Sequence, residues 1–183
     1  MTDIWLVRHG EAAASFDQDT DPPLSDLGRE QVMRSVACLS QCVPDDAQLL
    51  TSPKLRAIQT GDPFAALRER PLDIDHRFIE LPSPGALTER KEWIQRVLTG
   101  RWSELPESVH SWQSDILQAI QGLQVPTVIF SHFLVINTVA AHMSGEDEVL
   151  QCLPANASVH HLRVEEGSWQ WIARGEMLQS VVN

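Results

Sequence analysis

Near its start the chain reads Ile4-Trp5-Leu6-Val7-Arg8-His9-Gly10-Glu11, an apolar run that stops at an arginine, a histidine and a glycine. Such a run predicts a buried strand over about residues 3–9. Ligands of open α/β sheets bind at the carboxyl ends of the strands. We therefore expect Arg8 and His9 at the edge of a binding site, with Gly10 allowing a tight turn and close approach of the backbone to a ligand. Taken alone, a basic pair that solvates a strand end explains the stretch equally well.

The length and charge of the chain limit its class. A chain of 183 residues, 43% of them hydrophobic, is long enough for one substantial core and short for two, so we expect a single domain over 1–183. The formal net charge of −11 disfavours nucleic acid and anionic membranes as partners. Any basic patch must therefore be local.

The chain carries no sequence signal for a membrane or an export pathway. No apolar run approaches the ~20 residues that span a bilayer, and the first residues lack the pattern of a signal peptide, so we expect a cytoplasmic protein. The three cysteines, Cys38, Cys42 and Cys152, are an odd number that fits reduced thiols better than a disulfide framework. No Cys/His pair of metal spacing accompanies them, so we expect no metal site.

Helix and strand patterns alternate along the rest of the chain. After a polar loop over 11–23, interpreted as an exposed flap, Ser25 as N-cap begins a helix that ends near Gln41. Ser52 as N-cap, followed by proline, predicts a second helix through Leu67, with Asp62-Pro63 breaking or restarting it. We expect further strands over 47–51, 72–79, 127–131, 157–164 and 169–173, and further helices over 86–99, 108–123 and 133–141.

This alternation predicts an α/β fold, a three-layer α/β/α sandwich with a mostly parallel sheet. The last two strands, joined at residues 165–167, predict an antiparallel hairpin at one edge. His160 and His161 point to opposite faces of their strand, so we interpret them as core and surface residues rather than metal ligands. Gly28, in the first turn of the first helix, indicates either close packing or close approach to a ligand.

Three more side chains are candidates for a site, each with an ordinary structural alternative. Arg56 lies near the positive end of the second helix, where a cation is unfavourable unless an anion is nearby; the alternative is a surface arginine. His132 follows an apolar strand at a strand-to-helix junction that favours an anion, although a histidine there is usually structural. Glu80 ends the predicted strand over 72–79 and is either a general acid or a loop charge.

Together, these positions predict a phosphate pocket in an otherwise acidic protein. Arg8, Arg56 and His132, with His9, each follow a strand or begin a helix. Arginine offers planar, bidentate donors to phosphate oxygens. A neutral imidazole can attack phosphorus and form a covalent intermediate.

The sequence resembles the histidine phosphatase superfamily, the phosphoglycerate-mutase-like proteins. The matching motifs occur in the family's order and span most of the chain. They are Leu6-Val7-Arg8-His9-Gly10-Glu11, Leu24-Ser25-Asp26-Leu27-Gly28-Arg29-Glu30-Gln31, Ser52-Pro53-Lys54-Leu55-Arg56-Ala57-Ile58-Gln59-Thr60, Ser131-His132 and Asn156-Ala157-Ser158.

This resemblance implies the three-layer fold and a set of roles for the site residues. It implies that His9 is phosphorylated, that Arg8, Arg56 and His132 hold the phosphoryl group, and that a carboxylate placed like Glu80 protonates the leaving group. It also implies that neither a metal nor a cofactor is needed, because fixed positive groups stabilise the equatorial oxygens.

Departures from the family pattern narrow the expected activity. Phe133 replaces the usual glycine after the second histidine and is expected to narrow the pocket. The segment 81–85 replaces a glycine-tryptophan context common in mutases, and the flap lacks their tryptophan-asparagine pair, so mutase activity is disfavoured. We expect a metal-independent phosphomonoesterase that acts on a phosphorylated small molecule or phosphoprotein.

Two alternatives remain open at this point. The stretch 8–13 together with 23–25 resembles the small phosphohistidine phosphatases, so a phosphohistidine protein phosphatase is the enzymatic alternative. A catalytically silent module that binds phosphorylated ligands is the alternative from another class, because the pocket can persist without turnover.

Overall fold

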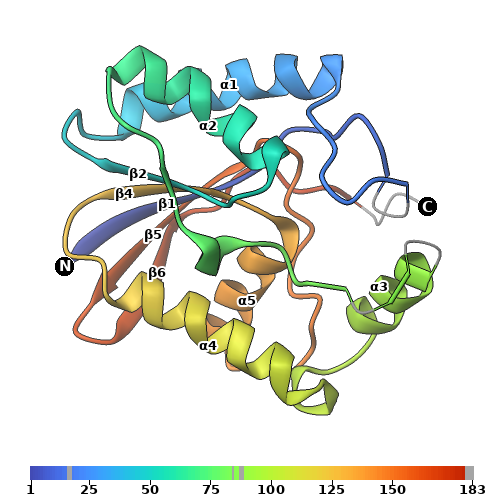
Figure 1. The fold of residues 1–183 in the computed structure, drawn as a ribbon. Helices are drawn as coiled ribbons and strands as arrows, with labels where there is room; N and C mark the ends of the chain where they lie inside the picture. Colours follow the sequence, from blue (N-terminus) through green and yellow to red (C-terminus); the bar gives the residue numbers. More distant parts are fainter. Residues whose placement is uncertain (16–17, 84, 87–88, 180–183) are drawn as a thin grey trace.

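The computed structural model describes residues 1–15, 18–83, 85–86 and 89–179. Within these ranges, six strands form one sheet in the order β3-β2-β4-β1-β5-β6 (Figure 1). The strands are β1 (Thr2–Arg8), β2 (Gln48–Thr51), β3 (Asp73–Ile74), β4 (Thr127–Ser131), β5 (Val159–Glu165) and β6 (Ser168–Ala173). The first four in this spatial order are parallel, and β5 and β6 add an antiparallel hairpin. The predicted sheet is confirmed.

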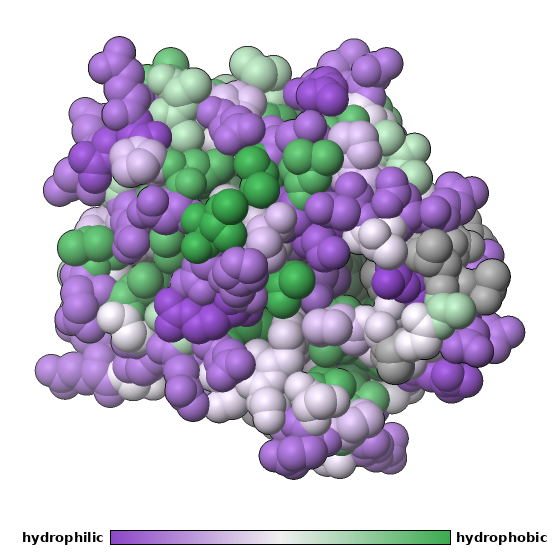
Figure 2. Space-filling view, in the orientation of Figure 1, coloured by the Kyte–Doolittle hydropathy of each residue, from purple (hydrophilic) through white to green (hydrophobic). Residues whose placement is uncertain are grey.

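Helices cover both faces of the sheet, which confirms the three-layer sandwich. Figure 1 shows α1 (Asp26–Cys42) and α2 (Leu55–Arg68) on one face, and α4 (Glu107–Gln121) and α5 (Phe133–Ser144) on the other, with α3 (Arg90–Leu98) beside them. Hydrophilic side chains cover most of the molecular face shown in Figure 2. None of the helices in the described part of the chain is long and apolar enough to cross a membrane.

Strand β1 serves both halves of the core. Successive side chains of a strand point to opposite faces, so Ile4 and Leu6 join the apolar cluster under α4 and α5, whereas Trp5 and Val7 join the cluster under α1 and α2. β1 runs parallel to β4 with Arg8 opposite Ser131. Because the two strands end in register, the residues that follow each of them meet at the same edge of the sheet.

The start of α1 is fixed by a cap and by a close backbone contact. Ser25 is the N-cap, as predicted, and its hydroxyl accepts a hydrogen bond from the Gly28 backbone at 2.9 Å. A Cβ at Gly28 would lie 2.1 Å from the carbonyl oxygen of Glu11, and a Cβ at Gly10 would lie 2.6 Å from the carbonyl oxygen of Gly28. Close packing therefore accounts for Gly28, and for Gly10 as well.

Helix α2 departs from the prediction at two points. Its N-cap is Lys54, not Ser52, and the flap residue Asp21 accepts a hydrogen bond from the Leu55 backbone N–H at 2.8 Å. Pro63 lies inside the helix and does not break it. A proline costs one backbone hydrogen bond, but the next residue, Phe64, is fully buried in the core, and this burial favours the continuous helix.

The strand predicted over 72–79 is wrong beyond its first few residues. Only Asp73–Ile74 pairs with β2, and a 3₁₀ turn follows over His76–Phe78. The Asp75 carboxylate accepts a hydrogen bond from the Arg77 backbone at 3.0 Å, and this local bond replaces strand pairing. The helix expected over 86–99 is observed over Arg90–Leu98; positions 84 and 87–88 lie outside the described residues.

The histidine pair in β5 lies as predicted on opposite faces. His160 is 1% exposed and His161 is partly exposed, with a ring nitrogen 2.8 Å from the Asp3 carboxylate. The three cysteines are free thiols.

Candidate active site

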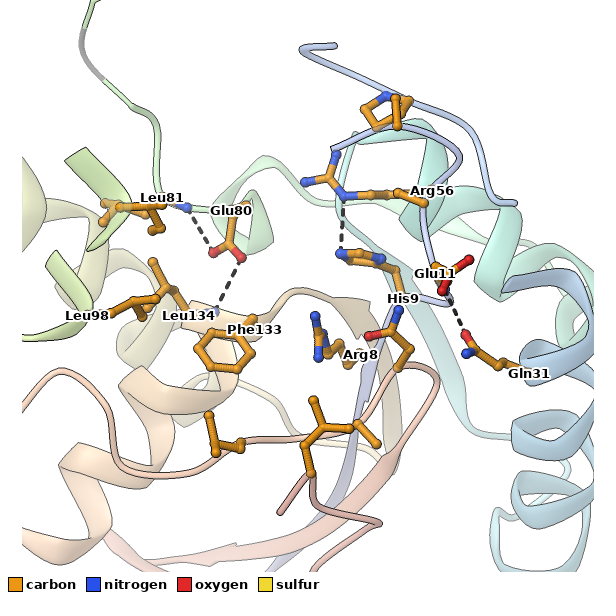
Figure 3. Close-up of a pocket in the computed structure, with 18 of the residues that line it drawn as sticks. Arg8, His9, Glu11, Gln31, Arg56, Glu80, Leu81, Leu98, Phe133 and Leu134 are labelled. Atoms are coloured by element: carbon orange, nitrogen blue, oxygen red, sulfur yellow. Dashed lines mark hydrogen bonds between the residues drawn. The ribbon is translucent and has the colours of Figure 1, made fainter. Parts of the chain in front are cut away.

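A cavity of about 690 Å³ opens at the carboxyl ends of β1 and β4 (Figure 3). Its walls include Arg8, His9, Arg56 and Glu80, four of the predicted site residues. His132 contacts His9, with the two rings edge to face and their centroids 5.2 Å apart. The fold thus brings together side chains that are up to 124 positions apart in sequence.

Gly10 has a different place from the other predicted residues. It does not contribute to the cavity walls described above, and its backbone N–H donates to the hydroxyl of Thr60 at 3.1 Å. The same hydroxyl donates to the carbonyl oxygen of Arg56 at 2.7 Å. Through Thr60, the turn after His9 is tied to the first turns of α2.

The hydrogen bonds of His9 define its tautomer. Nδ1 lies 2.7 Å from the carbonyl oxygen of Gly10, and Nε2 lies 3.1 Å from Nε of Arg56. A guanidinium can only donate, so Nε2 carries the lone pair and Nδ1 carries the proton. This assignment leaves the lone pair of Nε2 on the side of Arg56.

The surroundings of His9 also keep its ring neutral. Its pKa is lowered well below the ordinary value of 6.5, first by desolvation and then by the positive charges of Arg56 and Arg8. A neutral ring is the form that can act as a nucleophile.

Arg56 projects from the first turn of α2 and is 7% exposed. Burial lowers its pKa, and the nearby carboxylates of Glu80 and Asp21 oppose this shift. Its Nη1 lies 3.9 Å from the Asp21 carboxylate, so the flap supplies a counter-charge. Because Nε of Arg56 already contacts His9, the guanidinium and the imidazole face the same point in the cavity.

Arg8 is held from two sides at the end of β1. Its Nη1 donates to the carbonyl oxygen of Pro154 at 2.6 Å, and its Cζ lies 5.1 Å from the centroid of the Phe133 ring. Desolvation lowers its pKa to about 10, with Glu80 opposing the shift. Nε of Arg8 is buried and has no hydrogen-bond partner among the described residues.

His132 is the N-cap residue of α5 and is completely buried. Its Nε2 lies 2.6 Å from the hydroxyl oxygen of Ser52, and its Nδ1 has no partner within the described part of the chain. Desolvation, followed by His9 and the neighbouring cations, lowers its pKa well below 6.5. Ser52, which the sequence pattern assigned to helix capping, instead orients this ring.

Glu80 lies between α5 and the two arginines. One carboxylate oxygen accepts from the Leu81 backbone at 3.0 Å, and the other accepts from the Leu134 backbone at 3.3 Å. Its pKa is raised above the ordinary 4.5 because desolvation outweighs these hydrogen bonds and the charges of Arg56 and Arg8. A carboxyl group with a raised pKa can carry a proton into a reaction.

The described residues contain no group of three or more His, Cys, Asp or Glu side chains arranged to hold a metal ion. The positive charge of the cavity comes from its own arginines. Such an arrangement of two arginines around a neutral histidine suits a phosphoryl group.

The comparison with protein families decides the relationship. The family model of the histidine phosphatase superfamily (branch 1) matches residues 4–176. The chain belongs to this superfamily. No curated protein sequence matches this histidine phosphatase.

Solved structures share the fold of this histidine phosphatase at low sequence identity. A phosphoserine phosphatase from Entamoeba histolytica, solved with 3-phosphoglyceric acid, is 18% identical with a TM-score of 0.76, covering 97% of this chain and 98% of its own. Bacillus stearothermophilus YhfR is 21% identical with a TM-score of 0.78 and the same coverage. A mycobacterial glucosyl-3-phosphoglycerate phosphatase, solved with VO3, is 16% identical with a TM-score of 0.68, covering 92% of this chain and 96% of its own.

Sequence reasoning missed several groups that position the site of this histidine phosphatase. Ser52 and Thr60 contact site residues through their hydroxyls, Asp21 reaches Arg56 from the flap, and the Pro154 carbonyl fixes Arg8. The sequence signal for a site role of Ser52 and Thr60 was their place in the motif around Arg56. The Pro154 carbonyl has no side-chain signal at all.

Proposed function

We propose that this histidine phosphatase is a phosphomonoesterase that works without a metal, through a phosphohistidine on Nε2 of His9. The observation that carries the proposal is the state of His9: its Nδ1 proton bonds to the Gly10 carbonyl, and its Nε2 lone pair lies next to Arg56 at the cavity. This arrangement gives a neutral nucleophile whose orientation is fixed before the substrate arrives.

In the first step, Nε2 of His9 attacks phosphorus as the ester P–O bond breaks. The bonding electron pair stays on the leaving oxygen, which takes a proton from Glu80. Arg8 and Arg56 stabilise the equatorial phosphoryl oxygens. Nδ1 of His132 has no partner among the residues that the structure describes, and it can hold one of these oxygens by hydrogen bonding when it carries the proton.

In the second step, water attacks the phosphohistidine and breaks the P–N bond. Glu80, now a carboxylate, accepts a proton from this water, and His9 regains its lone pair as phosphate forms. The raised pKa of Glu80 supports its part in both steps, because a carboxyl group that holds its proton more firmly than usual can deliver it as an acid and then take one back as a base.

The comparisons support the hydrolytic class. Two proteins that share this fold are named as phosphatases, one for phosphoserine and one for glucosyl-3-phosphoglycerate. The flap lacks the tryptophan-asparagine pair expected of a glycolytic mutase, which favours hydrolysis over phosphoryl return to a second substrate.

A single pair of proteins tests the proposal. Wild type and His9→Ala are given 4-nitrophenyl phosphate, and the quenched wild-type reaction is analysed for protein-bound phosphate that is labile in acid and stable in base. Turnover and a phosphohistidine only in the wild type support the proposal. Binding of phosphate without turnover of any phosphoester in a broad panel would instead identify a phospho-ligand-binding module. Turnover restricted to a phosphohistidine protein would favour the protein phosphatase alternative.

A further inference from the structure

Beyond the phosphate end, the cavity has an extended apolar side. Large apolar side chains from several separate segments line this side. We call this set of side chains the apolar wall. The wall comprises Leu81, Ile94, Leu98, Phe133, Leu134 and Leu153. Leu81 and Leu134 are almost fully buried, and the other four are partly exposed. When partly exposed apolar side chains share one concave surface, covering them with an apolar ligand lowers the free energy of the complex.

The apolar wall begins where the proposed leaving group would emerge. Figure 3 shows Leu81, Leu98 and Leu134 beside Glu80, and Phe133 next to Arg8. Both oxygens of Glu80 bond to backbone groups of Leu81 and Leu134, so the carboxyl and the wall are held by the same residues. A group attached to the oxygen that Glu80 protonates therefore extends over these leucines.

The charges near the apolar wall disfavour an anionic leaving group. The negative charge there comes from Glu176, which lines the same cavity and whose carbonyl oxygen accepts a hydrogen bond from the Ala155 backbone, two residues after Leu153. Arg8 and Arg56 are occupied by the phosphoryl group in the proposed reaction. Arg34 also lines the cavity, but it belongs to α1, as does Gln31, which Figure 3 shows on the side opposite to Leu81 and Leu134.

The cavity volume agrees with an organic leaving group. At about 690 Å³, the cavity falls in the range of pockets that enclose drug-sized ligands, and such pockets are lined mostly by apolar side chains with a few polar groups for orientation. We propose that the substrates are phosphomonoesters of uncharged apolar alcohols, aromatic or branched, whose organic group packs on the apolar wall. This inference rests on the proposed function.

A substrate comparison tests this specificity without changing leaving-group chemistry. 2-Phenylethyl phosphate, glycerol 3-phosphate and phosphoserine are all esters of primary alcohols, so their P–O bonds break with similar ease. We expect kcat/KM for the phenylethyl ester to exceed that of the other two at least about 30-fold, because each well-packed apolar group contributes about 10-fold or more. Equal values, or a preference for phosphoserine, would overturn the proposal.

A matched pair of variants tests whether the apolar wall causes the preference for the phenylethyl ester. Leu98→Lys places a charge on the apolar wall, whereas Leu67→Lys places one on α2 at a side chain that is 58% exposed. We expect Leu98→Lys to lower kcat/KM for the phenylethyl ester about 10-fold or more and to leave glycerol 3-phosphate within about 2-fold, with no change in Leu67→Lys. Leu98→Ala serves if the lysine variant does not fold. A uniform loss for both substrates would contradict the proposal.

Binding of phosphonates separates this inference from the proposed function. These compounds resist hydrolysis, so calorimetry reports the apolar wall even if the protein turns nothing over. We expect 2-phenylethylphosphonate to bind at least about 10-fold more tightly than methylphosphonate, and Leu98→Lys to remove this difference. If no phosphoester is hydrolysed while this difference holds, the proposed function fails and the apolar ligand class stands. If both phosphonates bind equally while esters are hydrolysed, the apolar wall is not a ligand subsite.

Discussion

The two histidines of the site follow adjacent parallel strands, yet their local structures differ. After β1 the chain turns at Gly10 into the flap, and His9 keeps one nitrogen on its own turn and the other at the cavity. After β4 the chain enters α5 directly, and His132 is its N-cap, fully buried with Nε2 bonded to Ser52. The backbone that follows each strand therefore decides whether its histidine lines the cavity, as His9 does, or is buried next to it, as His132 is.

In the proposed reaction, His9 attacks phosphorus and His132 stabilises the phosphoryl group, and the contacts of the two rings fit these different roles. Nε2 of His9 has a lone pair beside a guanidinium, whereas His132 has its only described partner at Nε2 and an unpartnered Nδ1. The free N–H groups that normally make a helix start an anion site are also partly used here, because Leu134 donates to Glu80. The phosphoryl charge must then be met mainly by side chains.

Replacing His9 should produce the largest effect. His9→Ala removes the nucleophile, so we expect kcat to fall by about 10⁴-fold or more and the acid-labile phosphoenzyme to vanish. Steady-state kinetics and acid-quench labelling measure both. Substantial turnover in this variant would mean that His132, not His9, carries the phosphoryl group, and would reverse the comparison.

Glu80→Gln should produce the second-largest loss of activity, and only for substrates with poor leaving groups. Loss of the acid should slow alkyl phosphate hydrolysis about 100-fold to 10,000-fold, while phosphorylation of His9 by a reactive aryl phosphate changes much less. Single-turnover rates for an alkyl and an aryl ester measure the contrast. Equal, small effects on both would show that Glu80 is only a loop charge and would favour the phosphohistidine phosphatase alternative.

The pH profile of kcat/KM for an alkyl phosphate should have an acidic limb due to His9 and a basic limb due to Glu80. His9 must be neutral, and its pKa is lowered, so activity is lost only as the pH falls well below 6.5. Glu80 must be protonated, and its pKa is raised above 4.5, so activity declines as the pH rises past that raised value. Glu80→Gln should remove the basic limb and keep the acidic one; persistence of the basic limb would assign it to another group.

His132→Ala should cost less than loss of the nucleophile. We expect kcat to fall about 100-fold to 1,000-fold, the usual effect of removing one transition-state donor. Because Nε2 of His9 is intact, labelling should still detect the phosphoenzyme. An undetectable phosphoenzyme in a folded His132→Ala protein would show that the two histidines do not have separate roles.

The smallest effect should come from Ser52→Ala, which removes the partner of His132. A ring that is free to rotate should lower kcat about 10-fold with little change in KM. Ser52→Thr keeps a hydroxyl and should restore most of the rate. Ser35→Ala is a control, because this buried serine bonds only to the Val32 carbonyl among the described contacts. Equal losses in both alanine variants would indicate general destabilisation.

Local patterns predicted most of the sheet and the start of α1. An apolar run ended by a polar residue identified β1 and β4, and a capping serine identified Ser25. The same kind of signal placed the N-cap of α2 wrongly at Ser52. The Asp21 carboxylate in the flap, 34 positions away in sequence, accepts the hydrogen bond from the first backbone N–H of this helix. The break predicted at Pro63 is wrong for a related reason, since burial of Phe64 favours a continuous helix there.

The site itself was only partly readable from the sequence. Three strand and helix ends identified four residues, Arg8 with His9, Arg56 and His132, and the structure brings their side chains together. The contacts that orient them come from tertiary structure. A hydroxyl 80 positions from His132 and a backbone carbonyl 146 positions from Arg8 leave no periodic or capping signal.

The two arginines beside His9 also couple proton binding to anion binding. Burial, followed by the charges of Arg56 and Arg8, lowers the pKa of the ring. A bound dianion neutralises those charges, so it must raise the affinity of the ring for a proton, and by linkage a proton on the ring must strengthen anion binding by the same factor. We therefore expect the phosphate dianion, the product of the proposed reaction, to bind more tightly when the His9 ring carries a proton.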